Sequence, residues 1–278
     1  MVKGLVNKII PFSAVDGPGN RTAIFLQGCN FNCLYCHNPE TINLCKDCMK
    51  CVRFCPDRAL SVQDGKVRWD IKKCSRCDMC IKVCEYNSSP KVGLMSVEEV
   101  MEQIAKVRPF ISGITVSGGE CTLQPDFLRG MFTEVKKLGL STFVDTNGSI
   151  PFREMPELTG LMDKAMVDIK AYEIDEHMKL TGQDNLNVIE NVRFLARQDK
   201  LYEIRTVIVP DLLENLKNVD SISRLIADLN PDIRYKLIKY RPFGVRQNKM
   251  KSSVPTAKLL EELVQTAKSN GCKNIIVT

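Results

Sequence analysis

The chain has 278 residues, of which 44% are hydrophobic and 6% aromatic, a composition that can fill one large globular core plus an inserted unit. Its 39 basic and 33 acidic residues leave a formal charge of +6 without a long basic block, and aromatic side chains are few, so nucleic-acid binding is disfavoured. No apolar run could span a bilayer and the amino terminus lacks a signal-peptide core, so we expect no membrane partner and a cytoplasmic location.

An apolar strand at residues 23–26 is followed by a loop with Cys29, Cys33 and Cys36 at C-x3-C-x2-C spacing. The cytosol keeps thiols reduced, so closely spaced cysteines indicate a metal site, and thiolates suit iron–sulfur clusters. Three thiolates leave the fourth iron of a 4Fe–4S cluster open to a non-protein ligand. Structural zinc is the alternative, but its only local fourth ligand, His37, adjoins Cys36, and adjacent residues seldom reach one metal.

A cysteine-rich segment at residues 40–92 contains C-x2-C-x2-C-x3-C twice. Each copy matches the bacterial ferredoxin run, in which the fourth cysteine ligates the other cluster. This crossing predicts one set made of Cys45, Cys48, Cys51 and Cys84, and a second made of Cys74, Cys77, Cys80 and Cys55. Zinc knuckles are the alternative interpretation.

Between the two runs, residues 59–62 and 66–69 flank Asp64-Gly65, which is typical of a two-residue hairpin turn. A short hairpin between cluster loops fits a ferredoxin-like module. We therefore expect an inserted domain at 40–92, and a main domain built from 1–39 and 93–278.

Helical and strand patterns alternate after the insertion. A capping box at Ser96 opens a helix, because Glu99 follows three residues later. Further strands are predicted at 114–116, 142–145, 165–168, 202–209, 235–238 and 274–277, and further helices at 125–138, 185–198, 218–229 and 254–269. This alternation predicts an α/β fold with parallel strands and crossover helices.

Polar residues gather just after successive strands of this pattern. They are the cysteine loop and the segments 117–120, 145–148 and 168–170. Because the carboxyl ends of parallel strands meet at one edge of a sheet or barrel, we expect these segments to form one shared site.

Two stretches resemble a known family. One is Val15-Asp16-Gly17-Pro18-Gly19-Asn20-Arg21, before the cysteine loop, and the other is Cys36-His37-Asn38-Pro39, which begins at the last cysteine of the loop. With C-x3-C-x2-C, they resemble the radical S-adenosylmethionine (SAM) superfamily and, within it, the glycyl-radical-enzyme activases, most closely the YjjW-type subfamily. The resemblance runs through the cysteine-rich segment to Gly182 and is weaker after Pro210. It implies a partial (β/α)6 barrel with an inserted ferredoxin-like domain, three 4Fe–4S clusters and bound SAM.

The resemblance also implies a reaction. Reductive cleavage of SAM at the open iron gives a 5′-deoxyadenosyl radical, which takes a hydrogen atom from a glycine of a partner glycyl radical enzyme. The inserted clusters would relay electrons from a donor such as flavodoxin or ferredoxin, or would be structural. Rival interpretations are a radical SAM enzyme acting on a small molecule, an electron-transfer iron–sulfur protein and a zinc-bound scaffold.

Several residues acquire expected roles through the resemblance. The run Ser117-Gly118-Gly119-Glu120 resembles the family's SAM-binding G-G-E motif, although two glycines alone could be a plain turn. Asn38 and Asn147 are further expected SAM contacts, and Arg241 stands where relatives often have a histidine near SAM.

The segments after the third and fourth strands resemble a monovalent-cation site beside the SAM carboxylate. Its expected ligands are Asp145, Thr146, Met166 and Asp168, the middle two through backbone carbonyls. The two aspartates could equally cap helices. Lys170 would face the SAM carboxylate or the substrate strand, unless it is simply solvated.

Asp16 and Arg205 are expected where the partner's glycine loop enters. A charged Arg205 inside a β-branched strand needs an acidic partner such as Asp16, whether its role is structural or functional. His177 is expected on a helix surface, whereas Cys121 and Cys272 are expected to be packed residues without a ligand role.

Overall fold

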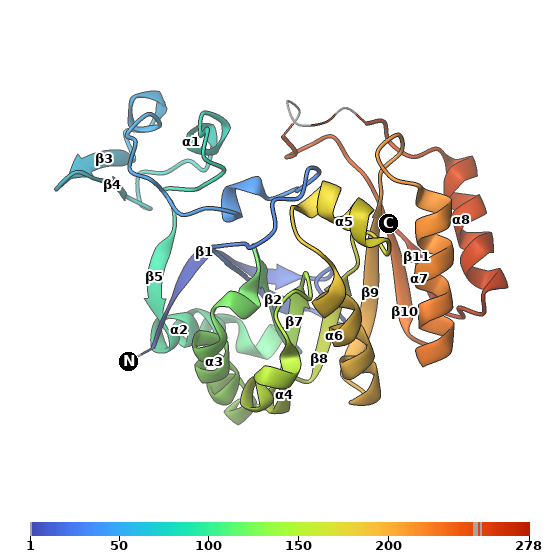
Figure 1. The fold of residues 1–278 in the computed structure, drawn as a ribbon. Coiled ribbons are helices and arrows are strands. Elements are labelled where there is room, and N and C mark those ends of the chain that lie inside the picture. The colour runs from blue at the N-terminus through green and yellow to red at the C-terminus, as the bar shows by residue number, and fades with distance from the viewer. Residues whose placement is uncertain (1, 247–249, 251) are drawn as a thin grey trace.

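A nine-stranded sheet organises the protein, which we describe from a computed structural model covering residues 2–246, 250 and 252–278 (Figure 1). In sheet order, its strands are β11 (Ile275–Val277), β10 (Arg234–Lys239), β9 (Leu201–Ile208), β8 (Lys164–Asp168), β7 (Ser141–Thr146), β6 (Gly113–Gly118), β2 (Arg21–Leu26), β1 (Lys3–Ser13) and β5 (Gly93–Ser96). The strands from β2 to β11 run parallel, whereas β1 and β5 are antiparallel additions at one edge.

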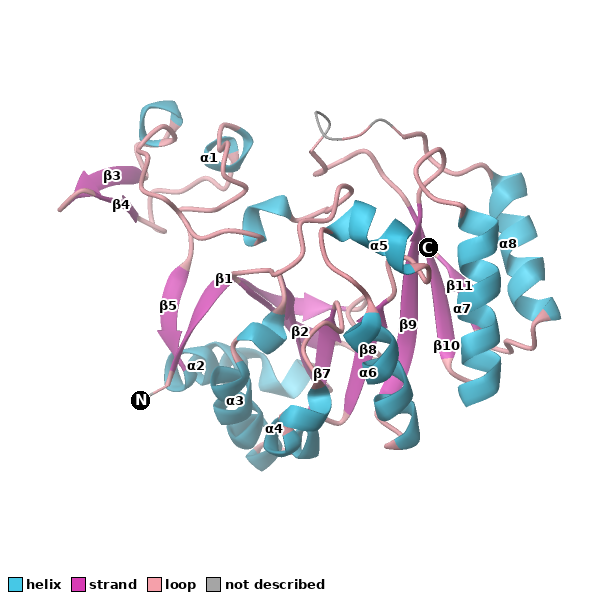
Figure 2. Ribbon diagram, viewed as in Figure 1, coloured by secondary structure: helices cyan, strands magenta, loops and turns pink. Residues whose placement is uncertain are grey.

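Helices connect the parallel strands. They are α2 (Val97–Val107), α3 (Pro125–Lys137), α4 (Pro156–Leu161), α5 (Ile174–Thr181), α6 (Leu186–Arg197), α7 (Asn215–Leu229) and α8 (Ala257–Ser269). Short 3-10 turns lie at Pro39–Thr41, Val52–Phe54, Arg108–Phe110, Cys121–Leu123 and Phe152–Glu154. The parallel strands follow one another along the sheet in chain order. Because crossovers between parallel strands are right-handed as a rule, this order places the helices on one face of the sheet, as in a barrel and unlike a doubly wound sheet. The α/β prediction, with a mostly parallel sheet, is confirmed (Figure 2).

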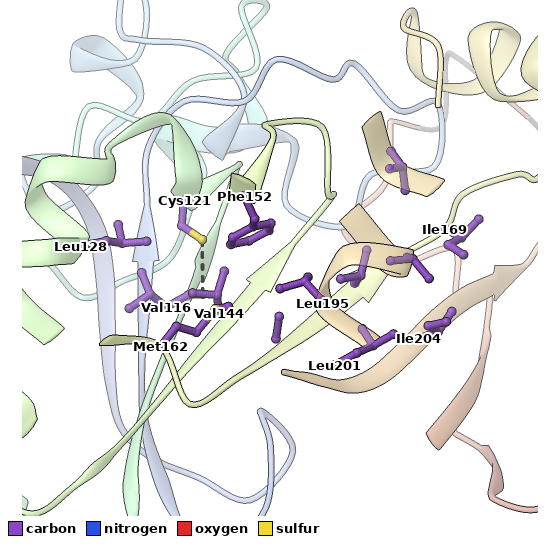
Figure 3. Packing of buried hydrophobic residues seen from close by; sticks show 14 of the residues in the cluster. Val116, Cys121, Leu128, Val144, Phe152, Met162, Ile169, Leu195, Leu201 and Ile204 are labelled. Atoms are coloured by element: carbon purple, nitrogen blue, oxygen red, sulfur yellow. Dashed lines mark hydrogen bonds between the residues drawn. The ribbon is translucent and has the colours of Figure 1, made fainter. Parts of the chain in front are cut away.

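The main core lies between the parallel strands and these helices. Figure 3 shows Val116 of β6, Val144 of β7 and Leu128 of α3 packed around Cys121. Cys121 is fully buried and its thiol approaches the Val116 carbonyl at 3.5 Å. Cys272 is also buried, so both cysteines are packed residues as predicted.

Most predicted elements are present, with shifts of one to three residues at their ends. The capping box at Ser96 is confirmed, since its hydroxyl accepts from Glu99 N while the Glu99 carboxylate accepts from Ser96 N. The helix predicted from residue 254 begins at Ala257 instead, because Thr256 caps it by accepting from Leu259 N. Sequence patterns did not reveal β1, β5 or α4, and α5 was expected only as the helix that carries His177.

The cysteine-rich segment lies apart from the helices of the main unit (Figure 1). Its hairpin is confirmed as β3 (Leu60–Gln63) paired with β4 (Lys66–Trp69), and a short α1 (Met79–Lys82) follows. Asp64 and Gly65 have φ values of +49° and +69°, the left-handed pair that a tight hairpin turn requires.

Arg21, at the start of β2, fixes the preceding turn to the sheet. It is only 1% exposed and donates to five oxygens, including Ile114 O at 2.6 Å and Thr115 Oγ1 at 2.8 Å. Its guanidinium also lies 4.1 Å from the centre of the Phe143 ring. Burial lowers the pKa of Arg21 to about 10. Arg21, the last residue of the motif at 15–21, thus joins β2, β6 and β7 at their amino ends.

We predict that Arg21→Met lowers the free energy of unfolding by about 3 kcal/mol, because several buried carbonyl and hydroxyl oxygens lose their donor. Urea unfolding followed by far-UV circular dichroism measures this. Arg129→Met is the matched control, since Arg129 makes surface ion pairs and its loss should cost less than about 1 kcal/mol. Equal losses in the two variants would contradict the structural role of Arg21.

Candidate active site

The three-cysteine loop follows β2 and rests on the end of α5. Asn32 N donates to Thr181 O at 2.8 Å and Leu34 N donates to Leu180 O at 2.9 Å. The Phe31 ring meets the His177 ring edge-on, with centroids 5.3 Å apart. The helix expected around His177 therefore supports the backbone of the loop.

The prediction that His177 lies on a helix surface is wrong. Its side chain is fully buried, and its Nδ1 lies 2.8 Å from Gln183 O, so Nδ1 carries the proton of a neutral ring. Burial lowers the pKa of His177, which favours that neutral form. The imidazole of His177 instead packs against the Phe31 ring and supports the cysteine loop.

The three thiols of the loop lie in a largely buried position. Cys29 Sγ accepts from Phe31 N at 3.4 Å and from Asn147 Nδ2 at 3.9 Å. Burial raises the pKa of Cys29 to about 12 and that of Cys33 to about 11, and it raises the pKa of Cys36 as well. The thiols are therefore protonated in the metal-free chain, and metal binding must release protons.

A segment after β10 covers the same loop. Arg246 donates to Asn32 Oδ1 at 2.6 Å and to Cys33 O at 2.5 Å, a clamp that the sequence analysis did not identify. Arg241 meets the loop through its backbone, because its carbonyl lies 3.2 Å from His37 Nε2. The expected contact of the Arg241 side chain with SAM stays a prediction.

The glycines of Ser117-Gly118-Gly119-Glu120 permit a close approach to β2 and the cysteine loop. A Cβ on Gly118 would lie 2.2 Å from Leu26 N, and one on Gly119 would lie 2.2 Å from Gly28 O. Glu120 N donates to Gly28 O at 2.8 Å. The two glycines are therefore required by packing against this chain's own backbone, whatever they contribute to a ligand.

Glu120 is 0% exposed, and its carboxylate takes four hydrogen bonds from the protein. Oε1 accepts from Thr122 N, Thr122 Oγ1 and Thr146 Oγ1, while Oε2 accepts from Asn147 N at 2.7 Å. Asn147 then reaches the cysteine loop, donating to Asn30 Oδ1 at 3.1 Å. Glu120 thus joins three loops of the site through its side chain.

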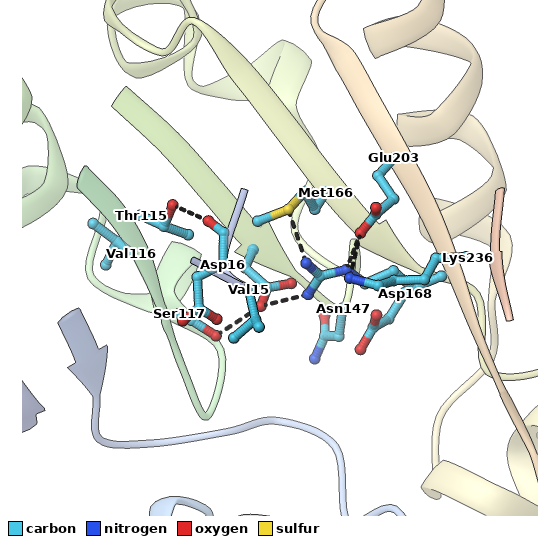
Figure 4. Close-up of polar contacts among 12 residues, drawn as sticks. Val15, Asp16, Thr115, Val116, Ser117, Asn147, Met166, Asp168, Glu203 and Lys236 are labelled. Carbon is cyan, nitrogen blue, oxygen red and sulfur yellow. Dashed lines mark hydrogen bonds and ion pairs between the residues drawn. The ribbon is translucent and has the colours of Figure 1, made fainter. Parts of the chain in front are cut away.

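Arg205 has acidic partners, as predicted, but Asp16 is not one of them. Arg205 Nη1 lies 3.0 Å from Asp145 Oδ2 and Arg205 Nε lies 2.5 Å from Glu203 Oε1. Asp16 instead accepts from Ser13 Oγ at 2.5 Å, and its carbonyl accepts from Thr115 Oγ1 (Figure 4). Asp145 is two strands away from Arg205 along the sheet, which is why chain spacing did not reveal the pair.

Glu203 is a buried anion that the sequence analysis did not identify. Its carboxylate lies 2.7 Å from Arg234 Nε and 3.6 Å from Lys236 Nζ, besides its contact with Arg205. Burial works to lower the pKa of Arg205, but Asp145, Asp168 and Glu203 outweigh it, and the net shift is upward. The barrel interior therefore holds a paired charge network below the cysteine loop.

The residues expected to bind a monovalent cation have protein partners. Asp145 contacts Arg205 and also accepts from Ser117 Oγ at 3.0 Å, and Asp168 contacts Lys170 at 2.5 Å. The Met166 thioether lies 2.9 Å from Arg205 Nη2. Both carboxylates thus already face a positive charge, and in this arrangement they do not fit a cation.

Lys170 is not a solvated lysine, since its side chain is 14% exposed. Burial works to lower the pKa of Lys170, but Asp168 outweighs it and holds the ammonium charged. Asn38 accepts from Thr41 N and Thr41 Oγ1 through its backbone carbonyl, which leaves its side-chain role a prediction.

The cysteines of the insertion line two hollows, each matching one predicted ligand set. The first hollow is lined by Cys45, Cys48, Cys51 and Cys84, together with Cys80. The second is lined by Cys55, Cys74, Cys77 and Cys80. Four thiols facing one space are a donor set that a 4Fe–4S cluster accepts. Among the described residues, no three Cys, His, Asp or Glu side chains already converge as a metal-binding group.

In the part of the chain that the structure describes, no helix has the length and apolarity to cross a membrane.

Comparison with known proteins identifies the family. Residues 23–226 match the model of the radical SAM superfamily, and the chain belongs to this superfamily. Several of its relatives are named as activating enzymes. The isethionate sulfite-lyase activating enzyme of Desulfovibrio desulfuricans is 30% identical, with 88% of this chain and 85% of the relative aligned. The indoleacetate decarboxylase activating enzyme of Tractidigestivibacter scatoligenes is 28% identical, with 99% and 98% aligned.

A solved structure supports the fold. QueE from Escherichia coli superposes with a TM-score of 0.56 over 99% of this chain and 94% of that chain, at 16% identity. Membership of the superfamily implies a 4Fe–4S cluster and SAM, and the buried thiols of Cys29, Cys33 and Cys36 fit that cluster. The resemblance to radical SAM activating enzymes is therefore confirmed. The YjjW-type assignment stays a prediction.

We predict that Glu120→Gln lowers the free energy of unfolding by about 2 kcal/mol, because an amide turns one N–H toward buried donors that it cannot satisfy. Thermal unfolding under anaerobic conditions measures this. Glu134→Gln, on the exposed side of α3, should stay within about 0.5 kcal/mol of the parent. If both variants unfold at the parent's temperature, Glu120 does not hold the loops together.

Proposed function

We propose that this chain activates a glycyl radical enzyme. Cys29, Cys33 and Cys36 would hold a 4Fe–4S cluster, which would supply one electron for cleavage of the carbon–sulfur bond of SAM into methionine and a 5′-deoxyadenosyl radical. That radical takes a hydrogen atom from one glycine Cα of the partner, leaving 5′-deoxyadenosine and a stored glycyl radical. The observation that carries the proposal is the three-cysteine loop at the carboxyl end of β2, in a chain aligned over 88% and 99% with relatives named activating enzymes.

The residues around the loop would bind and orient SAM. Proposed contacts are Ser117, Gly118, Gly119, Asn38, Asn147, Lys170 and Arg241. Lys170 is buried and charged, so it suits the SAM carboxylate, and the polar side chains of β7 and β8 lie at the same edge of the sheet. A monovalent cation at Asp145, Thr146, Met166 and Asp168 would require Arg205 and Lys170 to move away, so we leave it out of the mechanism.

Arg205 and Asp16 are proposed to line the entry of the partner's glycine loop. Asp145 and Glu203 hold Arg205 in place, and Ser13 holds Asp16. The protein's main contribution is orientation of SAM and the glycine, and exclusion of water and competing hydrogen donors. No side chain is needed as an acid or base in this reaction.

The insertion at residues 40–92 is proposed to hold two further 4Fe–4S clusters that supply electrons. Its two cysteine-lined hollows support this, and the alignment with the indoleacetate decarboxylase activating enzyme covers 99% of the chain, the insertion included. The external donor would be a small carrier such as a flavodoxin or ferredoxin. A cytoplasmic location is part of the proposal, because no disulfide joins the cysteines that the structure describes and closely spaced reduced thiols suit metal clusters.

We predict that Cys33→Ala abolishes SAM cleavage and leaves about two-thirds of the iron, because only the loop cluster loses a ligand. Iron analysis and chromatography of 5′-deoxyadenosine measure the two effects. Cys272→Ala, a buried cysteine on no proposed ligand set, is the control and should retain both iron and cleavage. Cleavage that survives Cys33→Ala would refute the assignment of the catalytic loop.

We predict that Cys48→Ala spares the loop cluster and impairs electron supply, because Cys48 lines only the first hollow. With photoreduced 5-deazaflavin as a direct reductant, SAM cleavage should persist, whereas with a protein donor it should slow. Loss of the loop cluster in this variant would show that the two parts do not assemble separately.

The proposal is tested by electron paramagnetic resonance on a mixture of the reconstituted protein, reductant, SAM and the glycyl radical enzyme encoded beside it. A glycine-centred doublet is the expected result. Formation of 5′-deoxyadenosine without a doublet, for every glycyl radical enzyme of the same cell, would contradict the proposal and favour a small-molecule substrate.

A further inference from the structure

The chain that leaves the cysteine loop turns back and binds to its beginning. Gly28 N donates to Thr41 O at 2.8 Å, and Cys29 N donates to Ile42 O at 3.0 Å. Ile42 is three residues before Cys45, the first cysteine of the insertion. One short hydrogen bond and a three-residue stretch of backbone therefore connect the catalytic loop with the first hollow.

Gln27 holds this junction in place. It is 2% exposed, and its Nε2 donates to Glu40 O at 2.8 Å and to Asn43 O at 2.6 Å. Its Oε1 accepts from Asn7 Nδ2 at 2.7 Å, which ties the junction to β1. This buried amide has three partners, one on β1 and two within residues 40–43, and it therefore holds residues 40–43 against β1.

The far end of the insertion returns to the same point. Asn43 pairs with Ser88 as an isolated bridge, and Asn43 N donates to Asn87 O at 3.0 Å. Cys84 Sγ lies 3.4 Å from Ser88 Oγ. Both Cys45 and Cys84, which line the first hollow, therefore lie within four residues of this bridge.

The second hollow is the one farther from the catalytic loop along the chain of bonded segments. Cys55, Cys74 and Cys77 line it without lining the first, and Cys80 lines both. Among the described residues, Cys55, Cys74 and Cys77 do not adjoin a segment that is hydrogen-bonded to Gln27 or to the catalytic loop. The contacts therefore connect the second hollow to the first hollow, the first hollow to the junction, and the junction to the catalytic loop.

We propose that the junction of Gln27 with residues 40–43 is the path by which electrons pass from the first hollow to the catalytic cluster. This rests on the proposed function and deepens it. A reduced one-electron carrier protein loses one electron and the centre held by Cys29, Cys33 and Cys36 gains it; no bond forms or breaks in the transfer. Electron tunnelling weakens steeply with distance and is favoured along covalent bonds and short hydrogen bonds, and the Ile42–Cys29 contact supplies such a path.

The test compares Gln27→Leu with Gln124→Leu in the anaerobically reconstituted full chain. Gln124 is a suitable control because its amide bonds the backbone of Leu5 in β1 and the backbone carbonyl of Gln27, and none of its hydrogen bonds among the described residues reaches the insertion. Gln124→Leu therefore removes a bond to the Gln27 backbone but leaves the bonds of the Gln27 side chain to residues 40–43 in place. Freeze-quench electron paramagnetic resonance follows reduction of the SAM-perturbed cluster, with reduced flavodoxin as one electron source and photoreduced 5-deazaflavin as the other. Iron content is measured in every sample.

In Gln27→Leu, reduction by flavodoxin should slow at least roughly tenfold, because a small displacement at the junction lengthens the path, while reduction by deazaflavin stays within about twofold. Gln124→Leu should match the parent with both donors. If Gln27→Leu loses iron, Asn7→Ala, which removes only the outermost bond to Gln27, replaces it and should show the same donor-selective slowing to a smaller degree.

Equal flavodoxin rates in the parent, Gln27→Leu and Asn7→Ala would overturn the proposed path. Failure of the proposed function gives a different result, since the parent itself would then form no glycyl radical with deazaflavin as reductant.

Discussion

One fully buried carboxylate determines the arrangement of the active-site loops. Glu120 would be costly to bury as an isolated charge, and the four donors from the segments after β6 and β7 offset that cost. Through Asn147 the same network reaches Asn30 and Cys29, so the position of the cysteine loop depends on it. The acid of the glycine-rich motif thus acts as a positioning residue.

The interior beneath these loops is charged yet paired. Arg205 lies between Asp145 and Glu203, and Lys170 lies against Asp168, so the buried charges compensate one another. Fixed dipoles and ion pairs in a closed site can orient a charged ligand without rearrangement when it binds. An interior of this kind suits SAM, which brings an ammonium, a carboxylate and a sulfonium into the barrel.

The sequence predicted features that depend on local spacing. The two ferredoxin-like runs predicted which cysteines share a hollow, and the alternation of helices and strands predicted the parallel sheet. The sequence failed to reveal a residue's partner where that partner is distant along the chain or where the contact leaves no recognisable sequence pattern. Arg205 pairs across strands with Asp145, and His177 is buried by packing on Phe31. Gln27 gave no signal because its partners are backbone carbonyls of the insertion.

The central claim is that three thiolates of one loop leave an iron open for SAM while the insertion's clusters are fully ligated. Mössbauer spectroscopy of the 57Fe-reconstituted protein, before and after addition of SAM, tests it most directly. About twelve irons per chain are expected, one of which changes its isomer shift when SAM binds. An iron content near four per chain, or a spectrum that SAM leaves unchanged, would contradict it.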